Sequence, residues 1–356
     1  MKKLLMAFVS LVLIVGEPAT ARADEVHKFV TLPDGVRFPE GIAANPANED
    51  IYVATFDFGP NANKLLRYDR KGQLLAQRDF GRAPLLGLLF DPAQQKVYIA
   101  NAGDLTGAGP AMVQRIAADF DSTTPIENLA ILPGIGAPRP RSEANPDGSN
   151  DIISFGSNGA PAPNAFELDK LGNLYVSDSF QGAIFRIDQA GSCTLPCAAT
   201  TLVHDPLLAT AGFPPFGANG LAFNSDDSAL FIANTGDDRI LKLDMASKAI
   251  SVFAESLNGA DGIVFDRLGR LWVAANQNDE VVALNANGRP VVRLGSFDGI
   301  GPDGAPKGLL FPASPVIVGD EMFVTNLAIA LTPAVGDEPE EAVTRWTVSR
   351  IKLPGL

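Results

Sequence analysis

The sequence is 356 residues long, with 28 basic and 41 acidic side chains and a formal net charge of −13 at neutral pH. So acidic a chain repels phosphate backbones and anionic lipid, which excludes nucleic acid and membrane surfaces as expected partners and favours a small-molecule ligand. Hydrophobic residues make up 46 % of the chain and there are two cysteines, so stability must come mainly from a large packed core.

The first 23 residues have the features of a secretory signal peptide. Lys2 and Lys3 precede an apolar stretch over 4–15 that is too short to span a bilayer comfortably, and Ala21-Arg22-Ala23 supplies a small-x-small cleavage pattern. Cleavage there leaves 25 basic and 40 acidic residues, a net charge of −15, and a mature chain that begins at Asp24. We expect a periplasmic or secreted protein, with an uncleaved membrane anchor as the alternative. Acidity also keeps an exported protein soluble.

Strand patterns dominate the rest of the chain, and one unit recurs. Each copy has an apolar-x-apolar run after a small residue, a polar turn, an apolar strand that ends in a small or polar residue, and a further alternating strand. The copy at 219–223, 230–234 and 240–244 is the clearest. The residues that precede each glycine-like position lie at 40, 86, 164, 219, 261 and 307, with steps of 46, 78, 55, 42 and 46 residues.

This spacing predicts a β-propeller. A four-stranded antiparallel unit with its turns takes about 40 to 50 residues, which is the length of one propeller blade. The spacing is too long for a coil of an open β-solenoid and too regular for a β-sandwich. We therefore predict an all-β, six-bladed β-propeller that forms a single domain over 24–356. The alternating segment Val26 to Thr31 precedes the first repeat, and we predict that it closes the ring as the outer strand of the last blade.

Two of the steps are longer than a blade. The 78-residue step contains 105–163, which is rich in Gly, Pro, Asn and Ser and includes Arg139 and Arg141. Long loops are often functional, so we expect this segment to be a lid over the tunnel mouth. The 55-residue step contains Cys193 and Cys197. Outside the cytosol, so close a pair is expected to form a disulfide in a loop, since no other cysteine is present to complete a zinc site.

The innermost strand of each propeller blade lines the tunnel, and its first residue, which we call the axial residue, points at the axis. Carboxylates and carboxamides that converge there need a cation between them. Hard oxygen donors suit Ca²⁺, with Mg²⁺ and Mn²⁺ as alternatives. The alternative is that Asn and Asp occupy these axial positions only because they are common turn residues before glycine, but this would not explain the glutamate at position 40. The predicted axial residues are Glu40, Leu86, Asn164, Asn219, Asp261 and Lys307.

Four motifs resemble the ligand motifs of the regucalcin (senescence marker protein)/gluconolactonase family of six-bladed propellers. They are Phe38-Pro39-Glu40-Gly41, Pro163-Asn164, 217–223 and 259–263. The resemblance covers nearly the whole mature chain. It implies that Glu40, Asn164, Asn219 and Asp261 hold a catalytic calcium or similar ion. The chain departs from the family at Ala162-Pro163, where the sugar-lactone hydrolases have an Arg close before the middle Asn, and this disfavours a sugar lactone as the substrate.

The resemblance implies metal-dependent hydrolysis of a lactone or related ester. Propellers of this size are often monomers, and we expect a monomer here. Asp261 and Asn164 are the expected catalytic residues, with Asp261 as the general base or nucleophile. A phosphotriesterase-like activity is a third possibility. The alternative class is a non-enzymatic binding protein with a structural ion, because 234–240 looks like a turn of the NHL-repeat propellers. His27 and His204 occupy no axial position, and no Gly-x-Ser-x-Gly motif is present, which disfavours a serine hydrolase.

Overall fold

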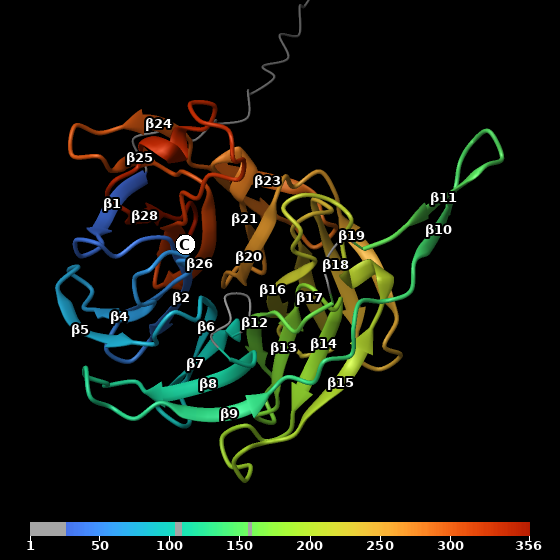
Figure 1. Ribbon diagram of the computed structural model, residues 1–356, viewed down its shortest axis with the longest axis horizontal. Coiled ribbons are helices and arrows are strands. Elements are labelled where there is room, and N and C mark those ends of the chain that lie inside the picture. The colour runs from blue at the N-terminus through green and yellow to red at the C-terminus, as the bar shows by residue number, and fades with distance from the viewer. Residues whose placement is uncertain (1–25, 104–108, 156–158) are drawn as a thin grey trace, which may run out of the picture.

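The computed structural model describes residues 26–103, 109–155 and 159–356, so the predicted signal peptide at 1–23 lies outside the described residues. Six four-stranded antiparallel sheets stand around a central tunnel as the blades of a propeller (Figure 1). The predicted fold class is confirmed. Helix is confined, among the described residues, to short 3₁₀ turns at Pro206–Leu208, Asn276–Asn278 and Pro339–Ala342.

Each blade runs from an inner strand beside the tunnel to an outer strand at the rim. The first two blades are β2–β5 (Pro39–Asn45, Asp50–Thr55, Lys64–Tyr68, Leu74–Asp79) and β6–β9 (Leu85–Asp91, Lys96–Asn101, Met112–Ala117, Glu127–Ile131). The next two are β12–β15 (Pro163–Leu168, Leu174–Asp178, Ala183–Ile187, Ala199–His204) and β16–β19 (Ala218–Phe223, Ala229–Asn234, Arg239–Asp244, Ile250–Ala254). The fifth is β20–β23 (Ala260–Phe265, Leu271–Ala275, Glu280–Leu284, Pro290–Leu294), and the sixth is β26, β27, β28 and β1 (Pro312–Val318, Glu321–Asn326, Thr347–Lys352, Val26–Thr31).

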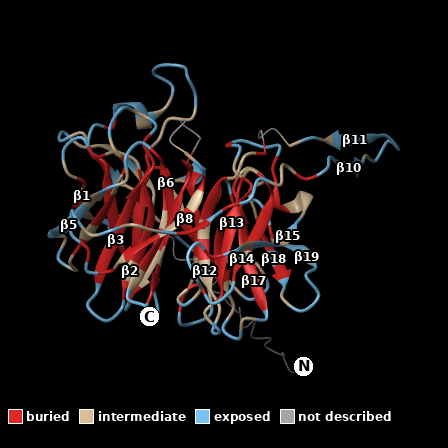
Figure 2. Ribbon diagram, turned by 60° about the horizontal axis from the view of Figure 1, so that its bottom comes forward, coloured by how far each residue is buried: buried red, intermediate tan, exposed pale blue. Residues whose placement is uncertain are grey.

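The core lies between the blades. The second strands β3, β17 and β21 are buried along their whole length because neighbouring blades cover both of their faces. The outer strands β5, β15 and β23 are largely exposed, and Figure 2 shows this gradient from a buried centre to exposed loops. Trp272, for example, is fully buried in a cluster with Met322 of the next blade. A blade is therefore stable only with its neighbours in place.

The ring is closed by its two chain ends, as predicted. β1 pairs antiparallel with β28, from Val26 opposite Ile351 to Thr31 opposite Thr347. Val30 is buried in a cluster that also contains Val53 of the first blade and Phe323 of the sixth. The N-terminal strand therefore joins the last blade by backbone hydrogen bonds and packs against the first blade by side chains.

An irregularity occurs at the same point of every blade. The pairing of the inner strand with the second strand shifts register immediately after its first pair, for instance between Pro39 and Ile42 and between Ala260 and Ile263. The same shift occurs in the other four blades. Bulges of this kind bend a strand and re-aim a side chain. The two residues left out of the pairing are the axial residue and the one after it.

The glycine that follows most axial residues allows two blades to approach each other closely. A Cβ atom at Gly41, Gly87 or Gly220 would overlap the carbonyl oxygen of the axial residue of the next blade, which is Leu86, Asn164 or Asp261 respectively. A Cβ atom at Gly262 would lie 2.8 Å from the carbonyl oxygen of Ala313. These Asn-Gly and Asp-Gly pairs therefore lie in strands, and their glycines serve close packing around the axis rather than turns.

The prediction for the sixth axial position is wrong. Lys307 and Gly308 lie in β25 (Pro306–Gly308), which pairs with β24 (Phe297–Ile300) in a separate hairpin. The inner strand of the sixth blade is β26, so its axial residue is Ala313. Phe311-Pro312-Ala313 matches Phe38-Pro39-Glu40 of the first blade, including the positive φ of both phenylalanines. The Lys-Gly-Leu-Leu-Phe pattern at 307–311 imitates the repeat without forming its inner strand.

The segment 105–163 is not one continuous loop. It contains β8 and β9, the outer half of the second blade, and a hairpin of β10 (Arg141–Ala144) and β11 (Asn150–Ile153). This hairpin projects away from the ring instead of crossing the tunnel mouth (Figures 1 and 2). β8 is hard to recognise in the sequence because it carries Arg115, which is buried and paired with Glu127 at 2.6 Å.

Cys193 and Cys197 form a disulfide between β14 and β15, with Cα atoms 5.7 Å apart. The backbone N–H of Cys197 donates to the carbonyl of Leu129 in the neighbouring blade at 2.7 Å, so the bridged loop is attached to the second blade. No helix in the described part of the chain is long and apolar enough to cross a membrane.

Candidate metal and substrate site

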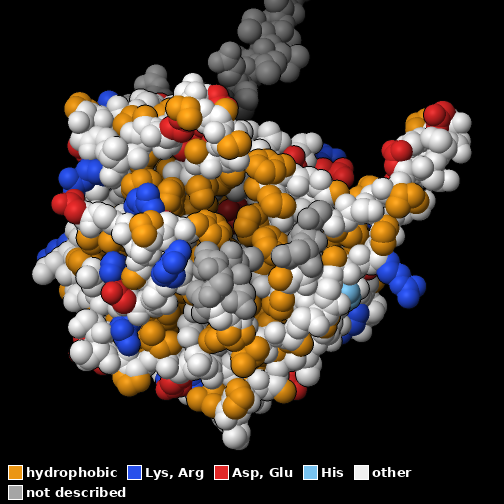
Figure 3. Space-filling view, viewed as in Figure 1, with side chains coloured by type: hydrophobic (Ala, Val, Ile, Leu, Met, Phe, Trp, Pro, Cys, Tyr) orange, Lys and Arg blue, Asp and Glu red, His pale blue; other side chains and the backbone are white. Residues whose placement is uncertain are grey.

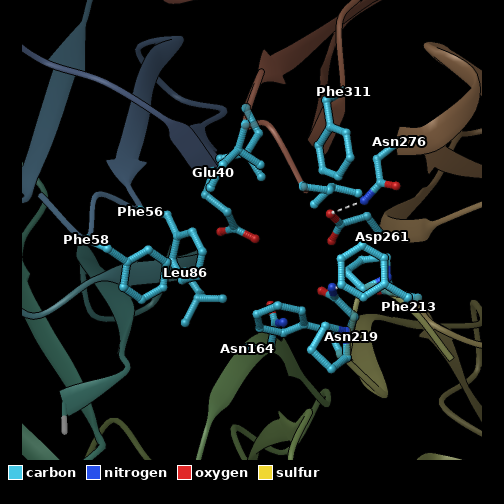
Figure 4. Close-up of a pocket in the computed structure, with 17 residues that line it drawn as sticks. Glu40, Phe56, Phe58, Leu86, Asn164, Phe213, Asn219, Asp261, Asn276 and Phe311 are labelled. Carbon is cyan, nitrogen blue, oxygen red and sulfur yellow. Dashed lines mark hydrogen bonds between the residues drawn. The ribbon is translucent and has the colours of Figure 1, made fainter. Parts of the chain in front are cut away.

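The axial residues of the six blades meet at one end of the tunnel. They are Glu40, Leu86, Asn164, Asn219, Asp261 and Ala313. Figure 4 shows that the four polar ones point toward the same central space. Each of these four is at most 5 % exposed. Strands from four blades, more than 200 residues apart in sequence, thus bring two carboxylates and two carboxamides together at the floor of a cavity.

The two amides are held with their oxygens available to the axis. Asn164 Nδ2 donates to Ser179 Oγ at 2.9 Å, and Ser179 Oγ in turn donates to the carbonyl of Ala218 at 2.8 Å. Asn219 Nδ2 donates to Thr235 Oγ1 at 2.9 Å. Since the nitrogen of each amide is engaged by a neighbouring hydroxyl, the oxygen is the atom left for a ligand.

Asp261 is positioned by a further amide that the sequence analysis missed. Asn276, which is 1 % exposed, donates from Nδ2 to Asp261 Oδ2 at 3.2 Å. Asn276 stands one residue beyond the second strand of the blade, as do Ser179 and Thr235 in theirs. Three blades therefore use the same position to orient the axial residue of their own inner strand.

Glu40 and Asp261 are both buried at the floor of the cavity, which makes it costly for both to be ionised. Burial, and then the nearby charge of Asp261, hold the pKa of Glu40 well above its usual range. Burial raises the pKa of Asp261 to about 7, against hydrogen bonds from Asn276 and Asn219 that favour the ionised form. Two buried acids in one site cannot both ionise cheaply without a compensating positive charge.

These residues fit a hard divalent cation. Glu40 Oε2, Asn164 Oδ1 and Asp261 Oδ1 are buried oxygens that have no hydrogen-bond partner within the described part of the chain, and buried polar atoms normally have one. The set consists of oxygen donors with a formal charge of −2, which suits Ca²⁺ and, behind it, Mg²⁺ or Mn²⁺. Within the described residues, no group of three or more His, Cys, Asp or Glu side chains could hold a metal. The candidate set is of a different kind, because half of it is amide.

Above the polar floor, the cavity is walled by apolar side chains from three parts of the ring. They are Phe56, Phe58 and Leu86 from the first two blades, the loop 213–216 before β16, and Phe311, Leu327, Ile329 and Leu331 of the sixth blade. The cavity has a volume of about 180 Å³. In Figure 3 it is a hollow in the centre of the ring face, surrounded by hydrophobic side chains, with an acidic group at its bottom.

Other residues singled out in the sequence lie elsewhere. None of the described residues between 109 and 163 lines the cavity, and Arg141 forms an ion pair with Glu143 on the projecting hairpin at 2.7 Å. His27 and His204 are exposed on the outer strands β1 and β15. The apolar walls were not predicted, although the clustered aromatics Phe56-Asp57-Phe58 and 213–216 follow or precede strands at the same end of the ring.

A family model supports the resemblance noted in the sequence. The model described as the SMP-30/gluconolactonase/LRE-like region matches residues 213–295, which include Asn219 and Asp261. No curated protein matches the sequence closely enough to count as a relative.

Solved structures share the fold along nearly the whole chain. A luciferin-regenerating enzyme superposes with a TM-score of 0.60 and 15 % identity, over 93 % of this chain and 95 % of its own. Regucalcin from Agrobacterium tumefaciens, described as a calcium-binding protein, gives 0.57 and 15 %, over 89 % and 92 %. A gluconolactonase from Xanthomonas campestris gives 0.54 and 16 %, over 91 % and 89 %. At such identities the likeness establishes the six-bladed propeller, and function must be argued from the site.

Proposed function

We propose that this protein is a cation-dependent hydrolase of a lactone or related ester. The observation that carries the proposal is a set of buried oxygens, at the floor of an otherwise apolar cavity, that find no hydrogen-bond partner among the described residues. The family match over 213–295 supports it, since that family's description includes gluconolactonase. Calcium is the proposed ion, with magnesium or manganese as alternatives.

Glu40, Asn164, Asn219 and Asp261 would hold the ion. When bound, it would supply Lewis-acid polarisation of an ester carbonyl and stabilise negative charge on its oxygen. Asp261 is the proposed general base or nucleophile, because Asn276 fixes one of its oxygens and leaves Oδ1 unpartnered. Asn164 completes the proposed catalytic pair, since its neutral amide oxygen can face the site without adding negative charge where the oxyanion develops.

The proposal extends to the location, the oligomeric state and the partner of the protein. We infer that the chain is exported with cleavage after Ala23, that 24–356 works as one monomeric domain, and that its partner is a small molecule. The signal-like sequence at 1–23 and the acidic composition support this inference.

Asp261→Asn tests the function. The variant keeps the shape and the bond from Asn276 but removes a charge and a base, so we expect turnover of lactones and aryl esters to fall at least about 100-fold. Asp34→Asn is the control, because the Asp34 side chain is 92 % exposed and the substitution should leave turnover unchanged. The assay is hydrolysis of a lactone and ester panel with calcium and with chelator.

The alternative is a non-enzymatic binding protein with a structural ion, which the calcium-binding description of the regucalcin structure favours. Calcium-dependent thermal stability without turnover of any lactone, ester or phosphotriester would support that alternative. Turnover that survives both chelation and Asp261→Asn would remove the basis for the hydrolase.

A further inference from the structure

We propose that the walls of the central cavity form a subsite for an uncharged, apolar alkyl or aryl group, so that the substrate is a lipophilic lactone or ester rather than a hydroxylated or anionic one. This inference rests on the proposed function for the reacting end of the ligand. The part of the inference that concerns the apolar group of the ligand rests on the cavity walls alone.

The polar groups of the cavity are confined to its floor. They belong to Glu40, Asn164, Asn219, Thr235, Asp261 and Asn276. The amide nitrogens of the three asparagines already donate to Ser179, Thr235 and Asp261. No lysine, arginine or histidine is among the described residues that line the cavity. A sugar lactone would therefore leave hydroxyls without side-chain partners in an apolar space, at a cost for each one. An anionic ligand would face two acids.

An apolar path leads from the floor to the rim. Leu86 occupies an axial position between Glu40 and Asn164, so the path begins at the level of the ion ligands. Phe56 lies beside it and Phe58 follows. Phe58 and Phe213 are 44 % and 57 % exposed, among the larger exposed aromatic surfaces of the described chain. Exposed aromatic area that continues into a cavity is typical of a ligand-binding site.

The aromatic wall is packed in advance of binding. The rings of Phe56 and Phe58 meet edge to face with centroids 4.6 Å apart, and Phe56 lies 6.2 Å from Phe216. Phe216 in turn packs on Phe180 at 5.3 Å. A wall held by such contacts loses little conformational entropy on binding.

The cavity volume sets the size of the group. An apolar cavity of about 150 Å³ binds benzene, and this cavity has a volume of about 180 Å³. It suits a phenyl ring or a chain of a few methylenes. A longer chain would extend past Phe58 and Phe213 toward solvent.

Two measurements test the subsite. In the first, kcat/KM is measured for γ-lactones of increasing alkyl chain and for glucono-δ-lactone, with calcium present. We expect an increase of about fourfold per added methylene until the cavity is filled, from the free energy of burying a methylene, and the lowest value for the sugar lactone. A flat series, or a preference for the sugar lactone, would overturn the subsite and leave the proposed hydrolysis standing.

The second measurement needs no turnover. The neutral fluorescent probe N-phenyl-1-naphthylamine is titrated into the wild type and into Phe58→Ala, Phe213→Ala and Leu171→Ala. The first two variants should raise the Kd of the probe on the order of fivefold each, since each loses part of a buried aromatic contact. Leu171, which is 73 % exposed and outside the cavity, is the matched control. If Phe58→Ala and Phe213→Ala bind the probe more weakly but the wild type hydrolyses no substrate, the subsite stands and the proposed hydrolase is refuted. If the wild type does not bind the probe, or if Leu171→Ala weakens probe binding as much as the other two variants do, the subsite is refuted.

Discussion

Gly220→Ala tests whether close contact between blades sets the spacing of the ion ligands. Gly220 follows the proposed ligand Asn219, and a methyl carbon on it would lie 2.8 Å from Ile263 N and closer still to the carbonyl oxygen of Asp261. Real Cβ atoms stay beyond 3.0 Å from such neighbours. Both obstacles are backbone atoms of the next blade, so the fourth and fifth blades must move apart.

The cost can be worked out from this clash. Overpacking a tight interior costs about 1 to 3 kcal/mol. With an unfolding entropy of about 2.1 cal/mol/K per residue, a domain of roughly 330 residues loses about 1.5 °C of Tm per kcal/mol. We therefore expect Tm to fall by about 1.5 to 4.5 °C. Calcium affinity should fall at least about tenfold, because displacement of Asp261 relative to Asn219 spoils a site that tolerates about 0.5 Å.

The assay is differential scanning calorimetry with and without calcium, together with isothermal titration by calcium. Gly134→Ala is the matched control, since a methyl group there meets nothing within 4 Å and the residue needs no positive φ. Equal Tm and equal calcium affinity in the two variants would refute the role given to these glycines. A lowered Tm with unchanged affinity would keep the packing argument and refute its link to the ion.

Three further predictions concern closure, pH and the disulfide. Removing 24–31 should lower Tm by more than 10 °C relative to a chain that begins at Asp24, because the outer strand of the last blade and buried Val30 are lost; a change of less than 2 °C would contradict closure by β1. The pH prediction concerns protein from which metal has been removed with a chelator. Its folded state keeps protons on Glu40 and Asp261, whereas the unfolded chain releases them from about pH 4. The free energy of unfolding should therefore fall as the pH rises from 4 to 7, where Asp261 titrates. Calcium should therefore raise Tm more at pH 8 than at pH 5, and an equal rise at both pH values would argue against Glu40 and Asp261 as ligands. Burial also raises the pKa of Glu167 to about 7. Its contribution to the pH dependence of the unfolding free energy should be the same with and without calcium. Replacing Cys193 and Cys197 by serine should cost at most about 2 kcal/mol, since the closed loop is short, and should leave calcium binding unchanged by titration.

The repeat pattern was sufficient to predict the fold because each blade must present the same apolar strands to its neighbours. The spacing also located Glu40, Asn164, Asn219 and Asp261 on the inner strands, where the structure brings them together. It failed at the sixth blade because the β24–β25 hairpin contains a Lys-Gly pair in front of a Leu-Leu-Phe run. The true axial residue, Ala313, is preceded by the same Phe-Pro pair as Glu40, a signal that was present but outweighed by the glycine.

The remaining features depend on contacts that sequence spacing does not encode. Asn276 orients Asp261 from the end of a different strand, and its role follows only from the pairing of β20 with β21. The expectation of one long loop over 105–163 missed β8 because Arg115 makes that strand look polar in the sequence, whereas in the structure Arg115 is buried and paired with Glu127. Apart from Leu86, the apolar walls come from loops of the first and sixth blades and from the loop before β16, and loop conformations cannot be derived from strand periodicity.

The seam between β1 and β28 has a consequence for biosynthesis. The strand made first finds its hydrogen-bonding partner only when the chain has grown by roughly 300 more residues, which takes about 15 to 60 s at 5 to 20 residues per second. During that interval one flank of the first blade has no neighbour, and its apolar side chains face water. We therefore expect the unfinished chain to be prone to association through this exposed flank until its final strand is available to close the ring.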